Sequence, residues 1–257
     1  MSGCFIAAWA VERDVSRIAS DHPALWREIR RFNLPVKLAL AAAQRVLPAL
    51  ESPKTARLIG LAPCRPGSPE LRAISRDLDA GFARGSSKNL RVNPIYTLHA
   101  IDNLGLSALS LRLENREPVS CLGGAAGQAW EALDEAMLLL ASGAVNEVLV
   151  FGGDQSDASW RGELASGAAD PEACGVALVM TAKPQRTKLV GMERVPIEPW
   201  AIDGAVVDHA HRRSETVVRP HAARGLAGWL AALQSRYAVP DEDGDGIDRI
   251  TLITEAL

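Results

Sequence analysis

The stretch VSCLGGAAGQAWEALDEAMLLLASGAVNEVLVFGGD, from Val119 to Asp154, decides how the chain folds. A short strand-like run ends in a glycine-rich turn, a helix starts directly from that turn, and a second apolar strand closes on a Gly-Gly-Asp sequence. The N-terminus of such a helix offers free N–H groups and a partial positive charge, and enzymes often place a nucleophile there. None of the residues at the predicted helix start, Ala126, Gly127 and Gln128, is a nucleophile. The stretch therefore has the layout of an active site without a reactive atom at the start of its helix.

Strands and helices alternate through the rest of the chain. Strands are expected where short apolar runs lie between turns, and helices where apolar residues recur with helical spacing. The expected strands are residues 4–11, 56–62, 117–124, 147–153, 174–183, 187–195 and 247–253, and the expected helices are residues 23–32, 35–50, 68–83, 94–113, 126–142 and 222–239. This alternation predicts an α/β fold in which a mixed sheet carries helices on both faces.

The length and composition are those of an ordinary globular protein. The 257 residues predict a single domain, residues 1–257, in which the irregular polar segment 196–220 is expected to be a mobile loop. Hydrophobic residues make up 47% of the chain and charged residues 23%, which is typical of globular domains. The formal net charge of -3 gives no electrostatic case for nucleic acid, and two Tyr and four Phe offer few platforms for base stacking. We therefore expect no nucleic-acid partner.

The cysteines and the N-terminus bear on the cellular compartment. The four cysteines, Cys4, Cys64, Cys121 and Cys174, are widely spaced and include no CxxC pair. This pattern favours reduced thiols in a cytoplasmic protein over a disulfide framework or a zinc site. The apolar run at the N-terminus is too short for a signal peptide, and no run approaches the roughly 18 apolar residues of a membrane span. The expected location is therefore the cytoplasm, without a membrane span.

Three motifs suggest a metal or a cofactor, and each has a simpler explanation. The acidic turn at residues 240–246 resembles the opening of a calcium loop, but Leu252 occupies the twelfth position, where Glu is needed. The sequence GGAAG lacks the G-x-G-x-x-G spacing of a dinucleotide loop, and no acidic residue follows at the expected distance. Nothing near His209 and His211 in the sequence completes a metal-ligand set. The sequence therefore predicts no cofactor and no bound metal.

Cys121 is the remaining candidate nucleophile. A reactive cysteine needs a helix N-terminus and an adjacent base. Cys121 lies five residues before Ala126, on the strand side of the glycine turn. Cysteines at strand ends are usually buried and inert, so an inert thiol is expected here, with Cys121 kept as a weak alternative.

Basic side chains gather in the first forty residues, at Arg27, Arg30, Arg31 and Lys37. Such a cluster could receive an acidic partner. A solvated helix face explains it equally well.

The central stretch quoted above resembles the corresponding segment of the β-ketoacyl synthases, which have the thiolase fold. In that family the helix begins at the catalytic cysteine, alanines recur on its face, and the following strand ends in a Gly-Gly pair. Matching Ala132 and Ala136 to the helix alanines places Ala126 at the position of the nucleophile. A slip of one residue would place Gly127 or Gln128 there instead.

The upstream sequence is similar to the same family. Pro94, Asn103 and Ser110 are in register with the synthase-like pattern, and residues 30–47 resemble an early synthase helix. The resemblance covers roughly residues 30–183. It implies a layered thiolase-like α/β fold, mainly its N-terminal half, with residues 221–257 resembling the start of a missing second half. The nearest pattern is that of the short ketosynthase-like proteins called chain-length factors, from aryl polyene and related type II polyketide-like pathways.

Two departures from the family decide what the resemblance implies for function. The synthases use a cysteine and two histidines, whereas this chain has Ala126 at the nucleophile position. His209, His211 and His221 do not lie in matching contexts. The resemblance therefore implies a chain-length factor that is not catalytic alone, in fatty acid, aryl polyene or polyketide-type biosynthesis. It would pair with a complete ketosynthase or with itself, and its further partner could be an acyl carrier protein.

Helical geometry adds an expectation that does not depend on the resemblance. At about 100° per residue, one arc of the predicted helix holds Ala129, Ala132, Leu133, Ala136, Met137, Leu139 and Leu140. The opposite arc holds Gln128, Glu131, Asp134 and Glu135 and is expected to meet water or a polar partner.

Two other functions stay open: an acyltransferase or thioesterase that uses Cys121, and a nucleotide-binding α/β module.

Overall fold

The computed structural model describes residues 4–63, 74–76, 78–79, 101, 103–123, 128–155, 173–185, 187–196, 223–224, 226–227, 230, 241–242 and 248–256. Several expectations lie outside these residues. They are the mobile loop 196–220 apart from its first residue, the candidate ligands His209 and His211, the aspartates at the tip of the acidic turn, and most of the helices expected at 68–83 and 222–239.

The described part of the chain contains one mixed sheet of eight strands. The strands are β1 (Cys4–Glu12), β2 (Arg57–Leu61), β3 (Val119–Leu122), β4 (Glu147–Asp154), β5 (Cys174–Thr181), β6 (Thr187–Pro196), β7 (Asp241–Glu242) and β8 (Asp248–Ala256). Their order across the sheet is β3-β2-β4-β5-β1-β6-β8-β7. Strand β2 pairs in parallel with β3 and β4, whereas β5 runs antiparallel to both β4 and β1. The α/β class, the mixed sheet and the positions of the seven strands predicted from the sequence are confirmed, whereas β7 lies in the segment that was expected to be an acidic turn.

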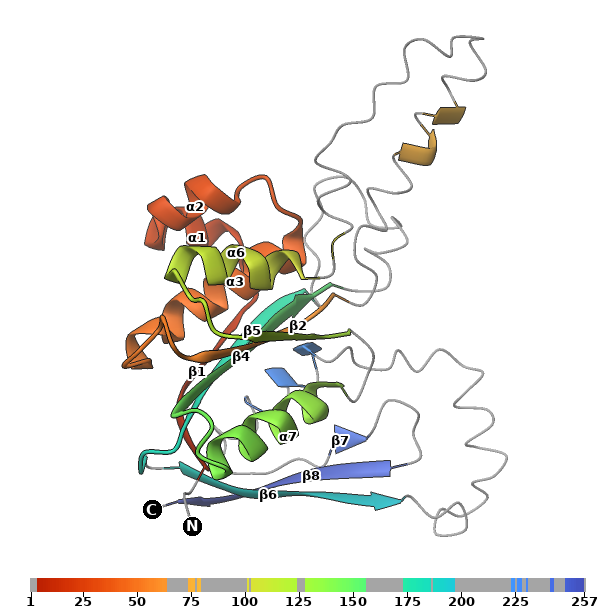
Figure 1. Ribbon diagram of the computed structural model, residues 1–257. Coiled ribbons are helices and arrows are strands. Elements are labelled where there is room, and N and C mark those ends of the chain that lie inside the picture. The colour runs from red at the N-terminus through yellow and green to blue at the C-terminus, as the bar shows by residue number, and fades with distance from the viewer. Residues whose placement is uncertain are drawn as a thin grey trace, which may run out of the picture.

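Helices cover both faces of this sheet (Figure 1). On one face lie α1 (Ser16–Asp21), α2 (Pro23–Ile29), α3 (Leu34–Val46), the short 3-10 helix η1 (Leu47–Ala49) and α6 (Leu104–Leu113). On the other face lies α7 (Gln128–Ala141), together with helical residues between 223 and 230. Each face has its own apolar cluster, and the residues of β4 and β5 alternate between the two. None of the described helices is both long enough and apolar enough to cross a membrane.

Helix α3 begins where the sequence predicts. The side chain of Asn33 caps it by accepting a hydrogen bond from the backbone N–H of Val36, at 3.2 Å. Pro35 occupies the first turn, where its missing N–H costs nothing. Two glycines then let the helix backbone touch the sheet. A Cβ on Gly153 would lie 2.0 Å from the carbonyl oxygen of Pro35, and one on Gly175 would lie 2.1 Å from the carbonyl of Leu38.

Helix α7 packs by the alanine face that the helical periodicity predicts. Ala129, Ala132, Leu133, Ala136 and Leu140 are all buried against the sheet, whereas Met137 and Leu139 of the same predicted arc are only half-buried. The small side chains allow the close approach of helix and sheet. The opposite arc differs from the prediction in one respect: Glu131 and Asp134 are exposed, but Glu135 is half-buried and bonded to the neighbouring strands.

Candidate functional site

The carboxyl ends of the parallel strands β2, β3 and β4 meet at one end of the sheet, and α7 begins there. Ligand sites of α/β proteins commonly lie at this end. The described part of α7 starts at Gln128, while Ala126 and Gly127 lie outside the described residues. The assignment of Ala126 to the nucleophile position therefore stays a prediction.

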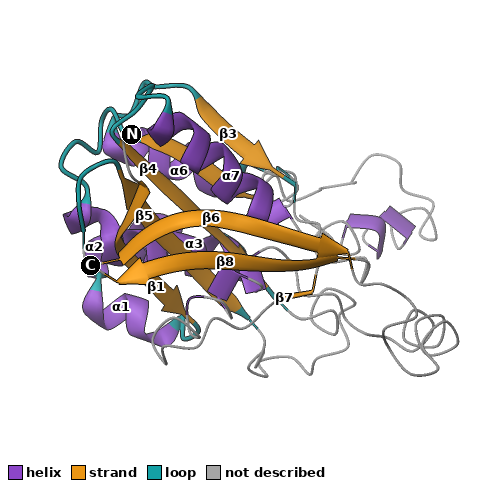
Figure 2. Cartoon of the chain, turned by 90° about the horizontal axis from the view of Figure 1, so that it is seen from below, coloured by secondary structure: helices purple, strands orange, loops and turns teal. Residues whose placement is uncertain are grey.

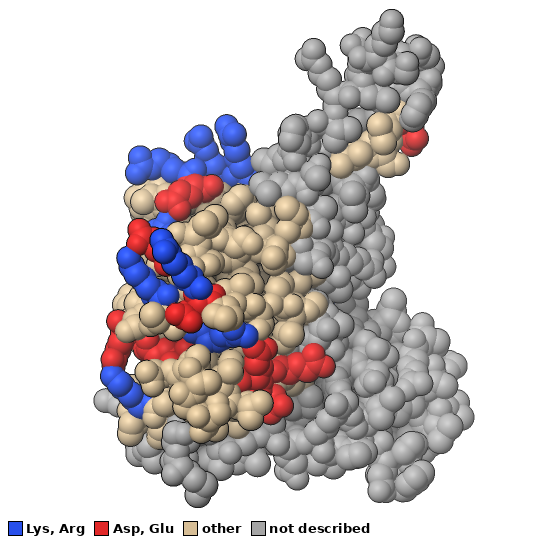
Figure 3. Space-filling model, in the orientation of Figure 1, with Lys and Arg blue, Asp and Glu red and all other residues tan. Residues whose placement is uncertain are grey.

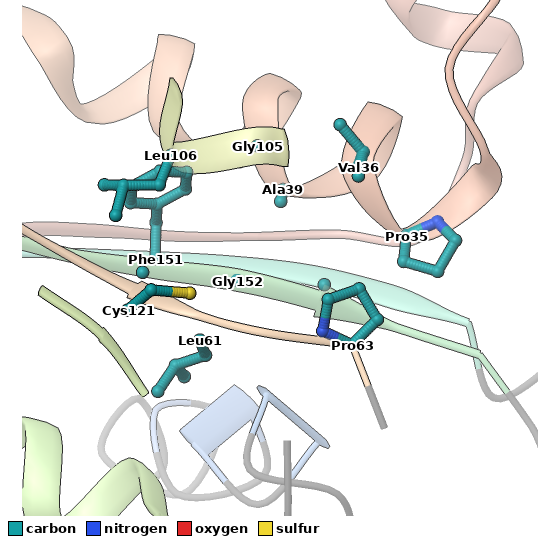
Figure 4. Close-up of a pocket in the computed structure, with 12 residues that line it drawn as sticks. Pro35, Val36, Ala39, Leu61, Pro63, Gly105, Leu106, Cys121, Phe151 and Gly152 are labelled. Atoms are coloured by element: carbon teal, nitrogen blue, oxygen red, sulfur yellow. The ribbon is translucent and has the colours of Figure 1, made fainter. Parts of the chain in front are cut away.

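A small apolar pocket lies at this end of the sheet, between the strands and helices α3 and α6 (Figure 4). Its volume of about 20 Å³ leaves room for about one water molecule. The lining residues are Pro35, Val36, Ala39, Gly60, Leu61, Pro63, Gly105, Leu106, Cys121, Phe151, Gly152 and Gly153. Figure 4 shows the side chains of Leu106 and Phe151 above that of Cys121, on the side of the pocket formed by α6. The pocket is thus nearly filled by the side chains of this chain.

Cys121 differs from the sequence expectation. It is exposed rather than buried, because β3 is the outermost strand of the sheet and only alternate side chains of β3 are partly covered. Its thiol is not in a disulfide, and its Sγ lies 4.0 Å from the carbonyl oxygen of Leu122. None of the described pocket residues carries an acidic, basic or imidazole side chain that could take the thiol proton. The exposure of Cys121 favours reactivity, whereas its surroundings do not.

A polar network behind β3 was not expected from the sequence. The Nη2 atom of Arg57 donates to the Oγ of Ser120 at 2.7 Å and to the Oε1 of Glu135 at 3.0 Å. The hydroxyl of Ser120 also donates to the same oxygen of Glu135, at 2.7 Å. The network joins β2, β3 and α7 and so fixes the position of the edge strand. The only sequence signal for it was an arginine at the start of an otherwise apolar strand.

A buried ion pair lies at the end of β4. The carboxylate of Asp154 is fully buried, and its Oδ2 lies 2.9 Å from the Nε of Arg224, whose side chain is 13% exposed. Arg224 belongs to the helical residues that pack beside α7, so the pair ties that helix to the strand end. Because the carboxylate of Asp154 is fully buried, loss of Arg224 would weaken the compensation of a buried charge.

The edge of the sheet at β3 is apolar. Val119 is 42% exposed, and one side of β3 has no neighbouring strand in the described part of the chain. Two leucines are also exposed on the helices nearest this strand in sequence, Leu111 of α6 and Leu138 of α7. Open strand edges of this kind tend to pair with another chain.

The basic cluster lies away from this edge, on α2 and its surroundings. Arg27, Arg30 and Arg31 are exposed, and Figure 3 shows Lys and Arg side chains gathered at the end of the molecule where α1 and α2 lie. Lys37 is half-buried, with its Nζ 5.5 Å from the centre of the Trp26 ring, and burial lowers the pKa of its ammonium group. None of these four residues is among those that line the pocket beside Cys121.

No family model matches the sequence, and no curated protein is significantly similar to it. Solved structures do match its fold. One is a ketosynthase in complex with its chain length factor from Xenorhabdus doucetiae, with 12% identity, a TM-score of 0.62 and coverage of 100% of this chain and 98% of that chain.

The ishigamide ketosynthase/chain length factor matches with 14% identity, a TM-score of 0.61 and 99% coverage of both chains. A type II polyketide acyl-carrier protein in complex with its ketosynthase bound to the hexaketide matches with 11% identity, a TM-score of 0.61 and full coverage of both chains. The fold implied by the sequence resemblance is confirmed. The chain has the layered thiolase-like fold of these ketosynthase and chain length factor structures.

Proposed function

We propose that this protein is a chain-length factor, a ketosynthase-like subunit without condensing activity of its own. It acts with a complete β-ketoacyl synthase in fatty acid, aryl polyene or polyketide-type biosynthesis. The thiolase-like fold supports this proposal, because two of the matching structures contain chain length factors. The observation that carries it is the combination of that fold with Ala126 at the predicted nucleophile position.

Alanine at the nucleophile position would have a chemical consequence. A synthase forms a thioester on its cysteine, and an alanine methyl group cannot form that bond. Cys121 is a poor substitute for such a thiol, because the described residues that line its pocket include no acidic, basic or imidazole side chain. The pocket is also too small to hold an acyl chain as it stands. The subunit would therefore act by shaping a surface that the partner's acyl chain meets, and by holding the partner in place.

The partner in this proposal is a complete ketosynthase, or a second copy of this chain when the ketosynthase is absent. The open apolar edge at β3 supports such pairing, because it can extend the sheet into another subunit. An acyl carrier protein is a further proposed partner, since one matching structure contains a carrier protein with its ketosynthase. We place the protein in the cytoplasm as a single domain, with residues 221–257 corresponding to the start of the second half of a synthase.

An assay of condensation tests the proposal. The purified chain is incubated with an acyl donor and a malonyl-loaded carrier protein, with and without a complete β-ketoacyl synthase. We expect no β-ketoacyl product from the chain alone, because it has no nucleophile at the helix start. Product should appear when the synthase is added.

One alternative remains worth testing because Cys121 is exposed. If the pure chain released product, and if Cys121→Ala abolished that release, the protein would be an acyltransferase or thioesterase instead. Affinity for a nucleotide in the absence of any synthase would favour a nucleotide-binding module.

A further inference from the structure

A second cavity lies at the carboxyl end of β1, and it shares no residue with the pocket beside Cys121. It has a volume of about 650 Å³, which is within the usual range for small-molecule sites. Trp9, Ala10, Val11, Glu12, Arg13, Asp14, Arg17, Arg45 and Ala227 line it. These residues come from β1, the connection from β1 to α1, the first turn of α1, the last turn of α3 and the helical residues beside α7.

The cavity lies beside the part of β1 that does not pair with β6. Strand β1 pairs with β5 as far as Glu12, but its pairing with β6 covers only Cys4, Phe5 and Ile6. Figure 2 shows the β6–β8 ribbon crossing over the other strands at an angle. The second half of β1 is therefore paired on one side only among the described residues, and its end opens into the cavity.

The walls of this cavity combine an apolar surface with cationic groups. Trp9, Val11 and Ala227 supply apolar surface, and the indole ring of Trp9 is half-buried. Arg13 and Arg17 lie at the rim and are exposed. An indole face and a guanidinium group are well suited to a ligand with a flat or aliphatic body and an anionic end.

Not all of the guanidinium groups at the cavity are neutralised by a neighbouring carboxylate. The carboxylate of Glu12 is engaged by the Nε of Arg45, so it does not repel an anion as a bare charge would. The Nε of Arg17 is 3.7 Å from Asp14 in an exposed pair, which is weak in water. Arg13 makes no hydrogen bond or ion pair within the described part of the chain. Its guanidinium group can therefore donate to a ligand without breaking an existing contact.

We propose that this cavity binds a small organic anion, a molecule with an apolar body and a carboxylate, phosphate or sulfonate group. The apolar body lies against Trp9 and Val11, and the anionic group is held by Arg13 and Arg17. Guanidinium groups bind such oxyanions through charge-assisted hydrogen bonds, often in pairs. The site does not depend on the chain-length-factor proposal, because it lies in a different cavity.

The test uses the full chain and the probe 1-anilinonaphthalene-8-sulfonate, with binding measured by calorimetry and by fluorescence. Its uncharged analogue N-phenyl-1-naphthylamine shows whether the sulfonate matters, and decanoate serves as a competitor with a different body and acid. We expect one saturable site. We also expect the double variant Arg13→Ala/Arg17→Ala to lose about tenfold or more in affinity, because two charge-assisted hydrogen bonds are removed.

The matched control is Arg27→Ala/Arg30→Ala, which removes two exposed arginines on and next to α2 and leaves the cavity intact. Its affinity should equal that of the unmodified chain. Equal affinity of the two double variants would overturn the proposal, and so would equal binding of the charged and uncharged probes. Because Arg13 and Arg17 are exposed, both variants should keep their thermal unfolding temperature, and this separates loss of the site from loss of the fold.

Discussion

Two glycines determine how closely α3 approaches the sheet. A Cβ at Gly153 or Gly175 would collide with backbone atoms of α3, and backbone cannot move aside as the end of a flexible side chain can. We expect Gly175→Ala to push α3 away from β5 and to lower the free energy of unfolding by about 1–3 kcal/mol, as overpacking of a core does. Urea denaturation followed by circular dichroism measures this loss.

Gly105 provides the control for that substitution. It lies in the first turn of α6, and its added Cβ would meet Val36 and Phe151 only at ordinary contact distances of 3.8 and 4.0 Å. Gly105→Ala should therefore be neutral, or should stabilise the helix by up to about 1 kcal/mol. A similar loss for both variants would show that the contact with α3 is not what makes Gly175 necessary.

Glu12 gives a prediction about pH. Burial raises the pKa of its carboxyl group above the ordinary value of 4.5, and the neighbouring Arg45 opposes this only in part. A carboxyl group with a raised folded pKa contributes stability below its unfolded pKa and loses it as pH rises through the folded pKa. The stability of the unmodified chain relative to Glu12→Gln should therefore fall as pH rises from about 4.5 through the raised folded pKa.

Glu114 should behave in the opposite way. Its hydrogen bond and ion pair with Lys54 lower the pKa of its carboxyl group. The stability of the unmodified chain relative to Glu114→Gln should therefore rise as pH increases from the lowered folded pKa to about 4.5. Urea midpoints over a pH series measure both differences. If the two stability differences changed with pH in the same direction, burial would not be the cause of the raised pKa of Glu12.

The exposure of single residues was only partly predictable from the sequence. Local rules predicted the start of α3 to within one residue, because the residues that favour a helix start lie within one turn of it. The same kind of rule failed at Cys121, whose exposure depends on the place of β3 at the sheet edge. It failed at Glu135 as well, because its partners Arg57 and Ser120 are far away in the sequence. Contacts between distant segments leave no local pattern to read.

Helix α7 shows what periodicity can predict at the scale of an element. The spacing of its alanines gave the buried face correctly, because a 3.6-residue period is a property of the helix alone. We expect Ala132→Leu to destabilise the protein by about 1–3 kcal/mol, since Ala132 has no exposed surface and three added carbon atoms have nowhere to go. Ala136→Leu should act similarly, for the same reason.

Asp134→Leu is the matched control, because it introduces the same side chain on the exposed face of the same helix. Its effect on stability should be within about 0.5 kcal/mol, as is usual for surface substitutions. Thermal and urea unfolding of Ala132→Leu, Ala136→Leu and Asp134→Leu would measure these changes in stability. If leucine were tolerated equally well at 132 and 134, the alanine face would not be what holds α7 to the sheet.

At the scale of the whole molecule, the sequence predicted the fold class but not the order of the strands. Alternating elements indicated a mixed sheet with helices on both faces, because each strand and helix must bury its apolar side. The order β3-β2-β4-β5-β1-β6-β8-β7 depends on which segments meet in space. It follows from the order that β3 is an edge strand, and the partnership proposed above depends on this position.

The strand edge at β3 is the expected surface of association. Val119 projects from the outermost strand and is 42% exposed, next to Ser120, which the network of Arg57 and Glu135 holds in place. A rigid, apolar strand edge can pair with an edge of another subunit, and a lysine there would bury an unpaired charge on pairing. We expect Val119→Lys to weaken association with a complete synthase, and self-association in its absence, by tenfold or more.

Light scattering and co-purification measure both associations. Ala24→Lys, on the exposed surface of α2, adds the same charge away from the edge and should leave association unchanged. Equal association of the two variants would place the interface elsewhere on the molecule. A chain that stays monomeric and does not bind a co-expressed synthase would refute the chain-length-factor proposal and leave the thiolase-like fold as it stands, because a subunit that shapes its partner's acyl tunnel must bind that partner.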